Sequence, residues 1–190
     1  SYKLPLSTTY VTFMVAMGLS VASMIRVGNQ KGLQNYKELR RIAFSIFFLG
    51  IILAVVFAIL FFVFHKIMPT IYVDLNDKTN YVDNMEVVSI ASKLLLAAAF
   101  FQISDSIQVL VLGALRGLQD VKIPTILTFI SYWVVGFPVS YFLGKEEVYG
   151  SFGIWLGLLA GLTTASILLF IRFNKLTLKL IKEKEKLILE

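Results

Sequence analysis

The sequence contains no cysteine and a single histidine, His65, among its 190 residues. A chain without cysteine forms no disulfide bond, thiolate nucleophile or cysteine-ligated metal site, and one histidine does not assemble a zinc site. We therefore predict that the protein is not an enzyme and that it carries no cofactor. We interpret His65 as a residue at a membrane interface rather than a ligand or a proton relay.

Charged side chains are also scarce, at 16% of the residues, whereas 57% are hydrophobic and the mean hydropathy is +0.79. These values lie above those of soluble proteins and predict an all-α membrane protein, because long apolar runs without strand-like alternation form helices. Five segments are long enough to cross about 30 Å of hydrocarbon. The predicted spans cover 4–25, 42–64, 94–115, 123–144 and 148–171, and 173–190 forms a basic amphipathic tail along the membrane surface or in solution.

The third of these segments carries a carboxylate, since Asp105 is the one ionisable side chain between Lys93 and Arg116. A charge near the middle of a bilayer is costly unless it is paired or solvated, and such a residue is a functional hypothesis by default. The alternative is that Asp105 is neutral and only hydrogen-bonds a neighbouring helix.

Polar residues accompany this carboxylate along the chain. Gln102 and Gln108 lie three residues to either side of Asp105, and Ser104 and Ser106 lie next to it. A helix is expected to place the three longer side chains on one face, with the serines at its margins. We expect this face to point toward protein or water and not toward lipid.

Local signals predict how the helices begin, bend and pack. Asn35, with Glu38 three residues on, is typical of a helix N-cap. Pro124 suits a first helical turn, and Pro138 predicts a kink near 136–138, one turn after Tyr132, whose hydroxyl could reach a central cavity. Glycines at four-residue spacing in the last span predict a close-packing face, formed by Gly153, Gly157 and Gly161.

The distribution of positive charge predicts the orientation. Thirteen of the 18 Lys and Arg residues fall in 26–41, 116–122 and 172–190, which lie on one side of the membrane if the spans alternate. By the positive-inside rule this side is cytoplasmic, and the C-terminus with it. A net charge of +6 would suggest nucleic-acid binding in a soluble protein, but in a membrane protein the location of the positive charges matters more than their sum, and we predict no nucleic-acid partner. A chain that starts outside without a signal peptide also predicts further spans upstream.

Three stretches resemble one known family: GLSVASMIRVGNQKG at 18–32, FFQISDSIQVLVLGALRGLQD at 100–120 and PTILTFISYWVVGFPVSYFLG at 124–144. Together they resemble the multidrug and toxic compound extrusion (MATE) family, in its NorM-like branch. The resemblance implies five transmembrane helices that correspond to helices 8–12 of a twelve-helix, two-lobe transporter. It also implies that the N-terminal lobe and the seventh helix, which contributes an acidic residue, belong to a longer parent chain.

Carried over by residue, the resemblance makes Asp105 the cation-binding aspartate, and we add Gln102, Gln108 and Ser104 to its predicted site. Phe101 stands where some members have a tyrosine, and Ala16 where many have proline. Residues 1–6 match the family poorly. The predicted substrate cavity is lined by Tyr132, Phe101 and Tyr10.

The function implied by this resemblance is antiport in a cell inner membrane, in which uptake of sodium or protons drives export of cationic amphiphilic drugs. Sodium is the expected ion because of the NorM-like branch, with Asp105 as its ligand. The proton is the alternative, since protonation needs only one carboxylate and Phe101 removes an oxygen. Two further alternatives are a lipid-linked sugar flippase, which would need basic residues in the spans, and a cation channel subunit.

Overall fold

The structure, a computed structural model, describes residues 3–64, 100–145 and 151–189. All the regular elements in these ranges are helical, as predicted. They are α1 (Lys3–Gly32), α2 (Tyr36–Phe64), a helix over 100–117, α5 (Lys122–Ile130), the π-helical turn η1 (Ser131–Gly136), α6 (Phe137–Leu143) and α7 (Ser151–Leu189).

Three of these helical segments are long and apolar enough to cross a membrane, namely Tyr36–Leu60, Lys122–Leu143 and Phe152–Leu189. The predicted spans over 42–64, 123–144 and 148–171 coincide with them in large part. The predicted span over 4–25 lies within α1, and the described part of the span over 94–115 lies within the helix over 100–117. Residues 94–99 and His65 lie outside the described ranges.

Local chemistry explains where the helices begin and end. The Asn35 side-chain oxygen accepts the backbone N–H of Glu38 at 3.3 Å, which confirms the predicted N-cap of α2. Two turns require a left-handed backbone, at Gln34 (φ 54°) between α1 and α2 and at Gln119 (φ 59°) after the helix over 100–117. Pro124 lies buried in the first turn of α5, as predicted.

The helix that contains Pro138 is interrupted just before it. Residues 131–136 form a π-helical turn, and the N–H of Phe137 donates to the carbonyl of Tyr132, five residues earlier. Proline has no N–H for the regular pattern, so a wider turn next to it accommodates the missing donor. The interruption lies where the sequence predicts a kink.

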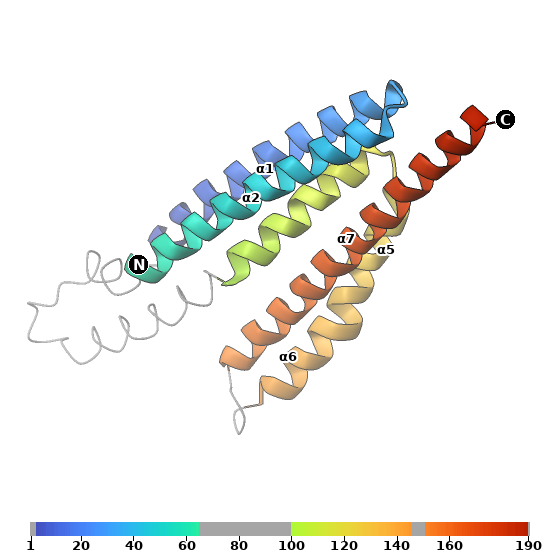
Figure 1. The fold of residues 1–190 in the computed structure, drawn as a ribbon. Helices are drawn as coiled ribbons and strands as arrows, with labels where there is room; N and C mark the ends of the chain where they lie inside the picture. Colours follow the sequence, from blue (N-terminus) through green and yellow to red (C-terminus); the bar gives the residue numbers. More distant parts are fainter. Residues whose placement is uncertain (1–2, 65–99, 146–150, 190) are drawn as a thin grey trace, which may run out of the picture.

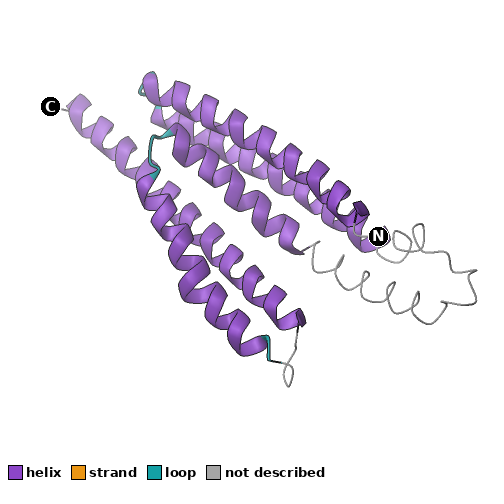
Figure 2. Cartoon of the chain, turned by 180° about the vertical axis from the view of Figure 1, so that it is seen from behind, coloured by secondary structure: helices purple, strands orange, loops and turns teal. Residues whose placement is uncertain are grey.

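The helices form two groups that meet at one end and splay apart at the other (Figures 1 and 2). One group contains α1, α2 and the helix over 100–117, and the other contains α5, η1, α6 and α7. Buried apolar side chains join them at the closed end, where Leu110, Ala114, Phe47 and Phe173 are each 5% exposed or less. The rings of Phe47 and Phe173 lie 5.3 Å apart, edge to face.

The helix α7 continues without a break through the predicted tail and is 39 residues long. Its last turns are held against α2 and the preceding turn, since Arg40 donates to Asn174 at 2.8 Å and Lys184 donates to the carbonyl of Gln34 at 2.8 Å. The tail is therefore a straight extension of the last span, because 162–189 contains neither glycine nor proline.

Candidate functional site

Asp105 lies in the first half of the helix over 100–117, and its side chain is half-buried. Within the described ranges, no residue forms a hydrogen bond or an ion pair with its carboxylate. The same side of this helix carries Leu112 and the exposed Arg116, whereas the opposite side carries the buried Leu110 and Ala114. Asp105 therefore belongs to the less covered side of its helix.

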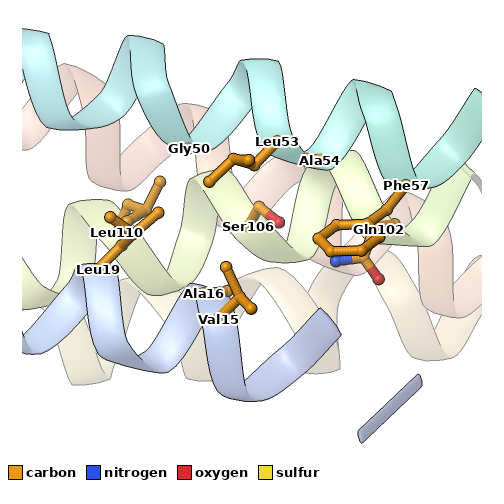
Figure 3. A pocket seen from close by; sticks show the side chains of 10 residues that line it. All are labelled: Val15, Ala16, Leu19, Gly50, Leu53, Ala54, Phe57, Gln102, Ser106 and Leu110. Carbon is orange, nitrogen blue, oxygen red and sulfur yellow. The ribbon is translucent and has the colours of Figure 1, made fainter. Parts of the chain in front are cut away.

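Gln102 and Ser106 lie on the side that faces α1 and α2. Both are buried, and both line a small pocket between the three helices (Figure 3). The pocket measures about 10 Å³, roughly the space of one water molecule. Its apolar walls come from α1, from α2 and from the helix over 100–117: Val15, Ala16, Leu19, Gly50, Leu53, Ala54, Phe57 and Leu110.

Gln108 faces the other group of helices. Its side-chain oxygen accepts a hydrogen bond from the hydroxyl of Tyr132 at 3.3 Å, and Tyr132 also lies within electrostatic range of Asp105. The structure thus differs from the expected single polar face. Gln102 and Gln108 are six residues apart, which on a helix separates them by about 120°, and Asp105 lies between them.

Ser104 is held by α7. Its hydroxyl lies 3.1 Å from that of Thr163, and its carbonyl accepts a hydrogen bond from the hydroxyl of Ser166 at 2.8 Å. Thr163 and Ser166 were not singled out from the sequence, although the run TTAS at 163–166 is a polar patch in an apolar span. That run was the available signal for a contact with the helix of Asp105.

The three residues of the predicted substrate cavity are not brought together by described side chains. The ring of Phe101 packs edge to face on Trp155 of α7, with 5.7 Å between the centroids. Tyr132 points to Gln108 instead. Tyr10 lies in α1, and its side chain is outside the described part of the structure.

No cluster of three or more His, Cys, Asp or Glu side chains able to hold a metal ion occurs within the described residues. The predicted oxygen donors near Asp105 are engaged elsewhere, Ser104 with Thr163 and Gln108 with Tyr132, and Gln102 lies in the pocket toward α1. The role of Asp105 as a sodium ligand stays a prediction.

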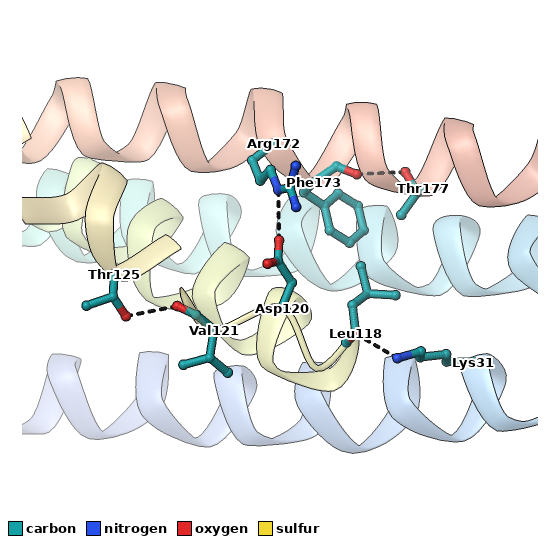
Figure 4. A network of polar contacts seen from close by, with 8 residues as sticks. All are labelled: Lys31, Leu118, Asp120, Val121, Thr125, Arg172, Phe173 and Thr177. Atoms are coloured by element: carbon teal, nitrogen blue, oxygen red, sulfur yellow. Dashed lines mark hydrogen bonds and ion pairs between the residues drawn. The ribbon is translucent and has the colours of Figure 1, made fainter. Parts of the chain in front are cut away.

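A second polar group closes the end where the two groups of helices meet (Figure 4). Arg172 of α7 pairs with Asp120 at 2.8 Å, and the two side chains are only 30% and 13% exposed. Lys31 of α1 donates to the carbonyl of Leu118 at 2.8 Å and to the side-chain oxygen of Gln119 at 3.0 Å. The segment after residue 117 is thus tied to both neighbouring helices.

Comparison with known proteins identifies the class to which this arrangement belongs. The MatE family model matches residues 1–142. The chain is 36% identical over 173 residues to multidrug resistance protein MdtK of Proteus mirabilis, covering 89% of this chain. It is 33% identical over 177 residues to probable multidrug resistance protein NorM of Rhodopseudomonas palustris, covering 93% of this chain. The chain belongs to the MatE family, and the predicted resemblance is confirmed.

The fold agrees with this assignment. The chain superposes on the crystal structure of the eukaryotic MATE transporter AtDTX14 with a TM-score of 0.75 at 19% identity, over 94% of this chain and 39% of that one. It superposes on the inward-facing conformation of a multidrug resistance MATE family transporter of the MOP superfamily with a TM-score of 0.77 at 15% identity, over 93% and 39%. The predicted all-α membrane fold is confirmed. The chain spans 36% of the length of both relatives named above.

Proposed function

We propose that the protein to which these helices belong is an antiporter in a cell inner membrane, which exports organic cations and drugs in exchange for sodium or protons. The observation that carries the proposal is the half-buried carboxylate of Asp105, which has no hydrogen-bond or ion-pair partner among the described residues of a membrane-spanning bundle. A carboxylate in this setting is stabilised by a bound cation or by protonation. The names of the relatives support a drug as the exported substrate.

The coupling follows from competition at this carboxylate. Asp105 holds the coupling cation in one conformational state and releases it when a cationic substrate occupies the site. The affinities for the cation and for the substrate therefore differ between the two conformational states. The proposed orientation has α7 ending in the cytoplasm, because the basic ends of α1, α2 and α7 lie on one side. Cationic amphiphiles and the lipid bilayer are the proposed partners.

The test is Asp105→Asn in the full-length protein, reconstituted in vesicles with a cationic dye. A sodium gradient at clamped pH should drive dye export by the unaltered protein, and the variant should lose nearly all of it. Glu183→Gln, which removes an exposed carboxylate at the far end of α7, is the matched control and should export normally. Undiminished gradient-driven export by Asp105→Asn would refute the proposal.

The same vesicles decide between the two ions. Sodium is the proposed coupling ion, as the sequence resemblance to the NorM-like branch implies, and the proton is the alternative. Export driven by a pH gradient in the absence of sodium would show that the coupling ion is the proton and not sodium. Flux that does not saturate and needs no counter-ion would instead identify a channel.

A further inference from the structure

Three of the five methionines of this chain lie on one face of α1. Met14, Met17, Val21 and Met24 recur at intervals of three and four residues, which places them on the same side of a helix. We refer to these four residues as the methionine face. Met14 and Met17 are 71% and 41% exposed, and Val21 is 45% exposed, so the described residues leave this face largely uncovered.

The methionine face borders the helix of Asp105. Ser20 donates its hydroxyl to the carbonyl of Val109 at 2.7 Å. An added Cβ on Gly117 would overlap the carbonyl oxygen of Met24. Because the later residue of α1 meets the later residue of its neighbour, the two helices run in the same direction.

Asp105 lies at the same depth as two of these methionines. Counting four residues back from the hydrogen-bonded pair in both helices brings Ala16 level with Asp105, since each helix rises about 1.5 Å per residue. Ala16 and Ser106 line the same pocket, which agrees with this register. Met14 and Met17 flank Ala16 in the sequence, and they are therefore nearly level with the carboxylate.

The methionine face and Asp105 also lie on the same side of this helix pair. The pocket toward α2 is lined by Ala16 and Ser106, but not by Met17 or Asp105. By helical periodicity, the pocket residues lie on one side of the contact between the two helices, and Met17 and Asp105 lie on the other. A molecule on that side, away from α2, can contact both.

The composition of the methionine face differs from that of a helix-packing face. The closest contacts between α1 and the helix of Asp105 involve small residues, namely Ser20, Gly28, Gly113 and Gly117. Small residues are typical of packing between membrane helices. Methionine is long, unbranched and polarizable, so its side chain adapts to ligands of different shape.

Charge favours an amphiphilic cation over a lipid chain as the occupant of this side. A lipid chain offers no counter-charge to a carboxylate at the same depth. A cationic amphiphile offers a positive charge to Asp105 and an apolar body to the methionines beside it.

We propose that the methionine face binds the apolar body of a cationic amphiphile whose charge is held at Asp105, and that it sets the range of substrate shapes that the protein exports. The inference rests on the proposed function, because it assigns substrate recognition to a wall of the same site. Met14 and Met17 contribute most, since they are nearly level with the carboxylate.

The experiment is the double variant Met14→Ile and Met17→Ile in the full-length protein, reconstituted in vesicles. Export is measured for ethidium, a flat cation, and for tetraphenylphosphonium, a globular one. Isoleucine stays apolar but is branched at Cβ and stiff at χ1, so the wall loses its adaptability. The ratio of kcat/KM for the two cations should change by about tenfold, the scale on which an apolar pocket discriminates one methylene group. An unchanged ratio would overturn the inference.

Two further variants separate this role from a general effect of substitution. Leu49→Ile makes the same kind of change on α2, where Leu49 is 47% exposed, and it should leave the ratio unchanged. Met14→Leu with Met17→Leu keeps both side chains unbranched at Cβ and should change the ratio less than the isoleucine variant does. A change in Leu49→Ile as large as in the isoleucine variant would contradict the proposed wall.

Folding and binding are measured separately from transport. Thermal melting in detergent reports the stability of each variant, and binding of the two cations in detergent should show the same change in their ratio. An equal loss for both cations together with a lower melting temperature would show that the methionine face packs against another helix of the longer chain, and the inference would be wrong.

Asp105→Asn, measured in the same vesicles, distinguishes failure of the inference from failure of the proposed function. If Asp105→Asn abolishes gradient-driven export and the isoleucine variant keeps the ratio of the unaltered protein, only the role of the methionine face is refuted. If Asp105→Asn keeps full export, the proposed function falls and the role of the methionine face falls with it.

Discussion

Two ion pairs of α7 show that burial, and not the distance between the charged atoms, decides how much an ion pair contributes to stability. Arg172 with Asp120 and Lys37 with Glu185 both have 2.8 Å between nitrogen and oxygen. The first pair is 30% and 13% exposed, and the second is 75% and 52% exposed. Water screens the exposed pair and competes for its charges, whereas removal of one partner from the first pair leaves a charge in a poorly solvated place.

We therefore predict that Asp120→Asn destabilises the protein by about 1 to 3 kcal/mol, the cost of an unsatisfied buried polar group. Glu185→Gln is the control and should change the stability by less than about 1 kcal/mol, as exposed pairs do. Thermal unfolding of the full-length protein in detergent measures both. Equal melting temperatures for the two variants would show that the Asp120 pair contributes no more than a surface contact.

At the scale of elements, α7 packs on η1 and α6 through a seam of small residues. An added Cβ on Gly136 would lie 3.3 Å from the Cα of Gly161, and one on Gly157 would overlap the backbone of Ser140. The predicted close-packing face of the last span is confirmed at Gly157 and Gly161. Close approach of the helices is what brings Tyr132 to Gln108, because η1 lies against α7, and α7 in turn bonds to Ser104.

Gly157→Ala should therefore be strongly destabilising, since backbone atoms cannot move aside as a flexible side chain can. We expect a loss of about 1 to 3 kcal/mol, as for overpacked cores, with less folded protein in the membrane. Gly32→Ala is the control, because nothing lies within 4 Å of an added Cβ there and alanine favours a helix. Normal expression and melting of Gly157→Ala would contradict the proposed seam.

At the scale of the whole molecule, much of the apolar surface is uncovered by the described residues. Large exposed side chains occur on every described helix named above, among them Met14, Phe48, Trp133 and Ile167. In a membrane protein, lipid covers such apolar surface, and so do further helices of a longer chain. Asp105 lies on an incompletely covered side of its helix, which supports a site completed by residues beyond those described.

We predict that residues 1–190 alone do not transport. An alternating-access transporter needs two opposed groups of helices around its site, and this chain spans 36% of the length of its relatives. Vesicles that contain only these residues should show no ion-driven dye efflux above empty vesicles. Efflux comparable to that of the full-length protein would show that the five helices suffice.

The sequence by itself determined the helical membrane class, the N-cap at Asn35, the interruption before Pro138 and the isolated carboxylate at Asp105. Each depends on residues close together in the chain: the length of an apolar run, a cap three residues from its partner, or a proline without an N–H. The family followed from short stretches of the same kind.

Only the tertiary structure decided which partners the polar residues have. Tyr132 meets Gln108 across 24 positions, Arg172 meets Asp120 across 52, and Arg40 meets Asn174 across 134. It also placed Gln102 in the pocket between α1 and α2 and Gln108 against Tyr132, where we had expected one shared face, and it directed the tail along α2. Helical periodicity predicts which face of a helix a residue occupies. The residue that it contacts on that face is determined by packing between helices that are far apart in the chain.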